Sequence, residues 1–139
     1  MVRSAIDNRE VIEIRSQSDV VLARQAGRAM ARDMGFGTAQ QTRLATAISE
    51  LVRNVLNYAG GGHCYLFDSS DDHYIKIRVH IEDQGPGIED IELALTDGYS
   101  STGSLGAGLP GARRLVQTFE IESSPQGTKI VIEIARTRG

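Results

Sequence analysis

Two polar residues with helical spacing could bind a metal ion and move a proton. Glu50 and Asn54 stand four residues apart, and Asn57 follows about one turn later. Residues four apart lie on the same face of a helix. An amide oxygen is a hard ligand suited to Mg²⁺, and a carboxylate can accept a proton from an attacking hydroxyl. An isolated pair of this kind is usually only a solvated helix face, so other motifs must support the chemical interpretation.

A second candidate is Asp83, which ends an alternating run and is followed by Gly85 and Gly87. It has the same parity as four apolar residues, Ile75, Ile77, Val79 and Ile81. Its carboxylate should therefore point toward the covered face of a sheet, where it needs a partner such as an ordered water or the 6-amino group of adenine. The two glycines would let the backbone approach the base closely. The alternative is a plain turn in which Asp83 accepts hydrogen bonds from nearby backbone amides.

A third candidate is the glycine-rich loop at 103–111, which runs directly into a predicted helix. Gly103, Gly106 and Gly108 could leave backbone amides free, and these amides together with the positive end of a helix can bind phosphate. The loop is not a Walker loop, because no Gly-Lys-Ser/Thr follows, and it does not continue a strand as a Rossmann loop does. A Gly-x-Gly pattern alone therefore carries little weight.

Thr128 is selected by strand parity. It continues the series of three apolar residues Ile130, Ile132 and Ile134, so its hydroxyl should lie on the same covered face as Asp83. There it could hydrogen-bond a nucleotide base or the Asp83 carboxylate. The alternative is a β-forming threonine that simply begins a strand after Gly127.

The elements that would position these residues alternate between helices and strand pairs. Ser18 and Asp19 offer capping oxygens for a first helix from Val20 to about Met34. Thr38 with Gln41 fits a capping box for a second helix, which the glycine run 60–62 ends. The second helix carries an apolar core face, Leu44, Ala47, Ile48, Leu51 and Val55. The remaining expected elements are a strand at 11–15, a hairpin of 64–68 and 74–83, a short helix at 91–95, a helix from 110 to about 118, and a strand pair of 119–123 and 129–135. This order predicts an α+β, two-layer sandwich with helices on one sheet face.

Composition narrows the function further. The 139 residues suit a single domain, 1–139, with 1–10 as a flexible start. The net charge is −3 and the basic residues are scattered, which argues against nucleic acid as a partner. We expect no membrane partner either, because no apolar run reaches about 20 residues. The absence of a signal-like start and the single cysteine, Cys64, favour a cytoplasmic protein, and the three histidines have no zinc-site spacing.

Taken in order, these motifs resemble the four nucleotide-binding boxes of the GHKL ATPase and kinase superfamily, which has the Bergerat fold. The four are Glu50-x-x-x-Asn54, Asp83-x-Gly85-x-Gly87, Gly106-x-Gly108 and Gly127-Thr128. The resemblance implies a mixed, mainly antiparallel sheet and an ATP pocket between sheet and helices. It also implies that Asn54 binds Mg²⁺ and that Asp83 binds the adenine amino group. Gly106 and Gly108 would line the phosphates, and Glu50 would be the general base.

Within that superfamily, the stretches 47–54, 59–60, 82–88 and 103–111 are similar to the switch serine/threonine kinases of the bacterial stressosome. This similarity covers nearly the whole chain from about Val11. It implies phosphorylation of STAS-domain scaffold proteins and, after release, activation of a PP2C-type phosphatase. The alternatives are an anti-sigma-factor kinase and a nucleotide-binding partner-switch module without turnover. The expected lid at 97–104 has no Lys or Arg. The positive charge beside the transferred phosphoryl group would therefore come from Arg53, Arg113, Arg114 or a partner's residue, or Mg²⁺ would do more of the stabilisation.

Overall fold

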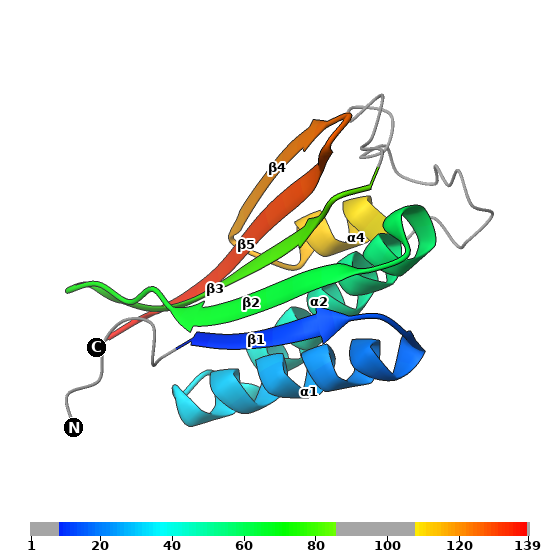
Figure 1. Ribbon diagram of the computed structural model, residues 1–139. Helices are drawn as coiled ribbons and strands as arrows, with labels where there is room; N and C mark the ends of the chain where they lie inside the picture. Colours follow the sequence, from blue (N-terminus) through cyan, green and yellow to red (C-terminus); the bar gives the residue numbers. More distant parts are fainter. Residues whose placement is uncertain (1–8, 86–107, 139) are drawn as a thin grey trace, which may run out of the picture.

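The computed structural model describes residues 9–85 and 108–138. They form two layers, a five-stranded sheet and a set of helices that covers one of its faces (Figure 1). The strands are β1 Arg9–Ile14, β2 Gly62–Asp68, β3 Tyr74–Asp83, β4 Thr118–Ser124 and β5 Gly127–Thr137. The helices are α1 Gln17–Asp33, α2 Thr38–Ala59 and α4 Gly108–Arg114. The predicted α+β two-layer sandwich is therefore confirmed.

The sheet has the strand order β1-β2-β3-β5-β4. Each of the four ladders between the described strands is antiparallel, in agreement with the mainly antiparallel sheet that was expected. The predicted hairpins appear as β2–β3 and β4–β5. The second strands of the two hairpins, β3 and β5, pair with each other over ten residues, from Tyr74 opposite Thr137 to Asp83 opposite Thr128. This register brings two of the predicted site residues to the same end of the sheet.

The core lies between the sheet and α2. The five predicted core residues of α2, Leu44, Ala47, Ile48, Leu51 and Val55, are all buried. Opposite them the alternating residues of β3 and β5 are buried as parity predicted, namely Ile77, Val79, Ile81, Ile130, Ile132 and Ile134. Each of these large side chains stabilises the fold by about 1.5–3 kcal/mol through removal of apolar surface from water. Their burial fixes which face of each strand meets the helices.

The helix starts differ from the predicted ones. Helix α1 begins earlier, with Ser16 as N-cap, and the Asp19 carboxylate accepts a hydrogen bond from the Ser16 backbone amide at 3.1 Å. Helix α2 has Gly37 as N-cap. Gln41 Nε2 donates to the Phe36 carbonyl at 2.9 Å, so the capping box expected between Thr38 and Gln41 is wrong. The buried Phe36 anchors this turn in the core, which places the helix start one residue before the prediction.

The helix predicted from 110 to about 118 is right in place and wrong in extent. Helix α4 begins at Gly108 rather than Pro110 and ends at Arg114, because β4 already starts at Thr118. It packs against α2 (Figure 1) and contributes Leu109 and Ala112 to the core. The short helix expected at 91–95 lies outside the described residues.

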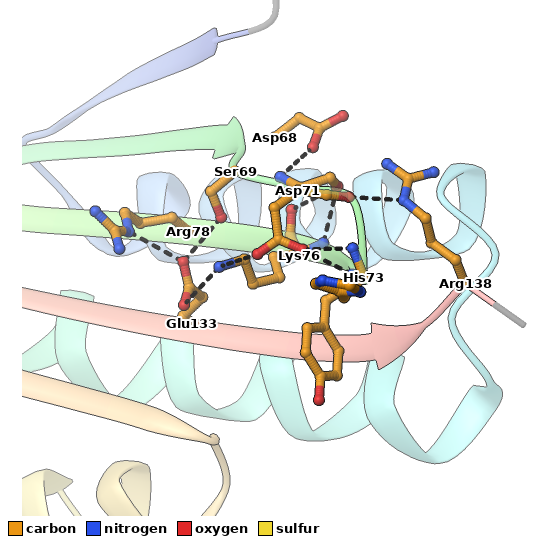
Figure 2. Close-up of polar contacts among 10 residues, drawn as sticks. Asp68, Ser69, Asp71, His73, Lys76, Arg78, Glu133 and Arg138 are labelled. Atoms are coloured by element: carbon orange, nitrogen blue, oxygen red, sulfur yellow. Dashed lines mark hydrogen bonds and ion pairs between the residues drawn. The ribbon is translucent and has the colours of Figure 1, made fainter.

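A buried carboxylate helps to hold β3 and β5 in register near the middle of their ladder, where Glu133 pairs with Arg78. Glu133 alternates with the core-facing residues of β5 and therefore lies on the other face, where it is nevertheless buried. It accepts hydrogen bonds from Arg78 Nε at 3.1 Å and Ser69 Oγ at 2.8 Å (Figure 2). Lys76 Nζ lies 4.0 Å from its other oxygen. The charge is paired on several sides, as a buried carboxylate requires.

The β2–β3 turn is tied to the same cluster through Asp71. Its carboxylate accepts hydrogen bonds from the amides of His73 and Tyr74, which lower the pKa of Asp71 to about 2. Its second oxygen lies 3.2 Å from Lys76 Nζ, and its carbonyl accepts from Arg138 Nε at 2.7 Å (Figure 2). These contacts join the turn to the last residues of β5.

The helices and the acidic, histidine and cysteine side chains can be examined only in the described part of the chain. None of its helices is both long and apolar enough to cross a membrane. Across residues 9–85 and 108–138, no three His, Cys, Asp or Glu side chains gather closely enough to bind a metal ion.

Candidate functional site

Asp83 lies at the end of β3, directly across from Thr128 of β5. It has the parity of the buried residues Ile77, Val79 and Ile81, so it continues the core-facing side of the strand to the sheet end. The Gly85 backbone amide donates to Asp83 Oδ1 at 2.9 Å, which is the plain turn that the sequence left open. A carboxylate has about four acceptor positions, so this bond orients Asp83 and leaves capacity for a ligand.

The backbone packs tightly around Asp83. A Cβ atom on Gly85 would lie only 2.6 Å from Ala59 Cβ, at the end of α2. Gly127 has φ +153°, and a Cβ there would collide with the Asp83 carbonyl oxygen. Only glycine fits at either position. The end of α2, the turn after β3 and the β4–β5 turn therefore close around one carboxylate.

Thr128 is buried, and its hydroxyl lies 2.8 Å from Ser123 Oγ. The sequence suggested a nucleotide base or Asp83 as the partner, and it did not single out Ser123. The two residues are cross-strand neighbours in the β4–β5 hairpin. The sequence could have predicted this pair, because a tight turn before Gly127 fixes which residues of the two strands lie opposite each other. Because either hydroxyl can be the donor, the pair can present a donor or an acceptor to a ligand.

A hollow of about 800 Å³ opens at this end of the sheet. Its wall includes Asp83, Ser123 and Thr128, together with the glycine run 60–62. This size falls within the range of small-molecule sites, about 300–1,000 Å³. The rim also carries charged or ionisable residues, Glu13, Arg15, His63, Glu82, Glu122 and Lys129. The hollow therefore combines a half-buried acceptor, two hydroxyls and close-packed backbone, which suits a flat ligand with an exocyclic amine.

Glu50 and Asn54 form a second group on α2. Both are partly buried, and Glu50 Oε1 lies 3.2 Å from Arg53 Nη1. Neither is among the described residues that line the hollow. The structure thus joins Asp83, Gly85 and Thr128 at the sheet end and keeps Glu50 with Asn54 on the helical layer.

The remaining predicted site residues belong to the glycine-rich segments. Gly87, Gly103 and Gly106 lie outside the described residues. Gly108 is the first residue of α4, the helix that packs against α2 (Figure 1). A helix therefore begins within the glycine-rich segment, at Gly108, and the phosphate-binding role of that segment stays a prediction.

Comparison with known proteins identifies the family. The family model described as histidine kinase-, DNA gyrase B- and HSP90-like ATPase matches residues 39–138. The chain belongs to this ATPase family. It is also 44% identical, over 126 residues, to the serine/threonine-protein kinase RsbT of Bacillus subtilis strain 168. The alignment covers 90% of this chain and 95% of RsbT, so the two ATPase-family chains correspond over nearly their whole lengths.

Solved structures show the same ATPase-family fold. A Mycobacterium tuberculosis chain with RsbU and RsbW domains matches with a TM-score of 0.62 and 17% identity, over 91% of this chain. The present chain spans about a third (33%) of the length of that one. The mycobacterial sensor histidine kinase MprB matches at 0.54 and 18% identity, over 93% of this chain and 97% of its own. The catalytic domain of histidine kinase ThkA matches at 0.51 and 21%, over 90% and 95%.

Membership in an ATPase family implies that the chain binds ATP. The described residues fit this ligand. The Asp83 carboxylate lines the hollow and keeps acceptor positions for an amine beyond the bond it receives from Gly85. The hydroxyls of Ser123 and Thr128 lie on the neighbouring hairpin, β4–β5.

Proposed function

We propose that the chain is a serine/threonine protein kinase that transfers the γ-phosphate of ATP to STAS-domain proteins of a stressosome. The observation that carries this proposal is the 44% identity to RsbT over 90% of the chain. The hollow beside Asp83 and Thr128 supports it, because its wall combines a carboxylate and two hydroxyls with which an adenine base could form hydrogen bonds. In this proposal the whole chain, 1–139, acts as a single cytoplasmic domain without nucleic-acid or membrane partners.

The nucleotide contacts in this proposal divide between the sheet end and the glycine segments. The free acceptor positions of Asp83 bind the adenine amino group, and Thr128 bonds the base or its bound water. Gly85 and Gly87 allow the backbone to approach the ring. Gly103, Gly106 and Gly108 expose amides toward the phosphates.

The reactive groups in this proposal come from α2. The Asn54 amide oxygen holds Mg²⁺, which when bound neutralises charge on the phosphate oxygens. Glu50 accepts the proton of the attacking serine or threonine hydroxyl. The new bond joins the hydroxyl oxygen to the γ-phosphorus, the bond to the bridging oxygen breaks, and ADP leaves.

After transfer, we propose that the kinase leaves its STAS partner and activates a PP2C-type phosphatase. The M. tuberculosis structure of matching fold contains RsbU and RsbW domains in one chain, which is in keeping with a partner-switching role for this kind of domain. The alternatives are an anti-sigma-factor kinase and a nucleotide-binding module without turnover. The end-to-end match to RsbT favours the switch kinase over both.

The test is transfer of labelled γ-phosphate from Mg-ATP to STAS-domain proteins from the same genome and to the chain itself. Glu50→Gln should still bind ATP but slow transfer about 10²- to 10⁴-fold, because it removes a general base. Asp83→Asn should weaken ATP binding about 10- to 100-fold, the equivalent of one hydrogen bond to a charged group. Glu120→Gln, at an exposed position of β4, is the matched control and should behave as wild type.

Each other outcome points to a different function. Equal loss of ATP affinity in Glu50→Gln and Asp83→Asn would contradict their separate roles. Release of free phosphate without labelled protein would indicate an ATPase. Tight partner binding that needs no ATP, with no transfer, would indicate the binding module.

A further inference from the structure

Glu50 does not stand alone on α2. Arg53, three residues later, places Nη1 at 3.2 Å from Glu50 Oε1. Residues three apart are neighbours on a helix surface, so the pair needs no change of backbone to form. From this contact we infer that Arg53 is a positioning residue that holds the Glu50 carboxylate in place for proton transfer. This inference rests on the proposed kinase function.

The surroundings of the Glu50–Arg53 pair indicate that its main effect is to orient Glu50 and not to stabilise the fold. The Glu50 side chain is 23% exposed and that of Arg53 is 43% exposed, so the contact lies at the border between core and solvent. Leu51, Val52 and Val55 on the same stretch of helix are buried. A partly exposed i,i+3 pair contributes little to folding. Its larger effect is to select one of the several rotamers that a long acidic side chain otherwise samples.

The contact also leaves the carboxylate able to react. Arg53 approaches Oε1, and a carboxylate has a second oxygen with acceptor positions of its own. A hydroxyl proton can therefore be accepted while the ion pair remains. Holding a reacting group in place matters, because a displacement of about 1 Å can reduce a rate about 10²-fold.

The pair changes the role assigned to Arg53. The sequence left Arg53, Arg113 and Arg114 as sources of positive charge for the transferred phosphoryl group. Because Arg53 is engaged by Glu50, Arg113 at the end of α4 or a residue of the partner protein is the better source. Arg53 then acts through Glu50 and is not itself a catalytic residue.

The test compares Arg53→Gln, Arg53→Lys and a matched control, Arg43→Gln. Arg43 is exposed on the same helix and lies seven residues, about two turns, before Glu50. Arg53→Gln should lower kcat for phosphotransfer about 10-fold, with KM for ATP and for the STAS acceptor unchanged. Arg53→Lys, which keeps the charge, should recover part of that loss. Arg43→Gln should match wild type in both constants.

A second comparison separates positioning from general damage. If Arg53 acts only through Glu50, adding Arg53→Gln to Glu50→Gln should cause no further loss of the residual rate. Equal losses in both backgrounds would overturn the inference, as would a raised KM for the acceptor with unchanged kcat, since that indicates docking. A wild-type rate in Arg53→Gln would overturn the inference and leave the kinase function intact. Absence of phosphotransfer in the wild type would overturn both the inference about Arg53 and the proposed kinase function.

Discussion

Replacing Gly85 with alanine perturbs the packing that orients Asp83. The added Cβ would lie 2.6 Å from Ala59 Cβ and 3.0 Å from Ala59 Cα, where ordinary contact begins at 3.4 Å. Neither of the two Cβ atoms can rotate away, because each is fixed directly to its backbone. The turn after β3 or the end of α2 must therefore shift, and the Gly85 amide that bonds Asp83 Oδ1 shifts with it.

The expected loss has two parts. Overpacking of this kind costs about 1–3 kcal/mol of unfolding free energy. For a domain of this size each kcal/mol lowers Tm by about 4 °C. A displaced Asp83 also loses its alignment with the ligand amine, which should weaken ATP binding about 10- to 100-fold.

The assay measures unfolding by urea and ATP binding by calorimetry in Gly85→Ala, Ala59→Gly and the double variant. Ala59→Gly removes the atom at 2.6 Å, so the double variant should recover part of both losses. Recovery should be incomplete, because Ala59 Cα still lies 3.0 Å from the new methyl group. Ala59→Gly alone should cost no more than about 1 kcal/mol, the usual penalty of glycine in a helix.

Two results would refute the reasoning. Normal stability and ATP affinity in Gly85→Ala would mean that the turn and α2 are not in close contact. A loss in Gly85→Ala that Ala59→Gly does not reduce at all would mean that the clash with Ala59 is not its cause.

Three further predictions test other parts of the fold. Burial raises the pKa of Cys64 to about 12, so thiol reagents at pH 8 should label it only after urea unfolds the chain. Arg136 donates to the Met34 carbonyl at 3.0 and 3.1 Å and lies 5.8 Å from the Phe36 ring; Arg136→Ala should lower the urea unfolding free energy by about 1–3 kcal/mol. Burial lowers the pKa of His80. Its neutral form therefore contributes to the unfolding free energy above the unfolded pKa, near 6.5, and this contribution is lost as the pH falls through the lower, folded pKa. The drop in unfolding free energy between pH 7.5 and 5.5 should therefore be smaller in His80→Phe than in wild type.

Periodicity alone predicted most of the scaffold correctly. The five apolar positions of α2 and the alternating residues of β3 and β5 are buried as expected, because spacings of 3.6 and 2 residues report which face meets the core. The helix caps were less predictable. Phe36 is buried beside the start of α2, and this tertiary anchor overrode the local capping signal of Thr38 and Gln41.

The candidate site was also predictable only in part from the sequence. Residue type and order were enough to select Glu50, Asn54, Asp83 and Thr128 as candidates and to indicate the superfamily, which the family match over residues 39–138 confirms. The Glu50–Arg53 pair is also local and could have been predicted from its i,i+3 spacing.

Only the tertiary structure decided which residues meet. The register of β3 with β5 places Asp83 opposite Thr128, and that of β4 with β5 gives Thr128 the hydroxyl of Ser123 as its partner. The approach of Ala59 to Gly85 depends on how α2 lies under the sheet. These contacts follow from packing between segments far apart in the chain, and such packing is set by the whole core rather than by any local pattern.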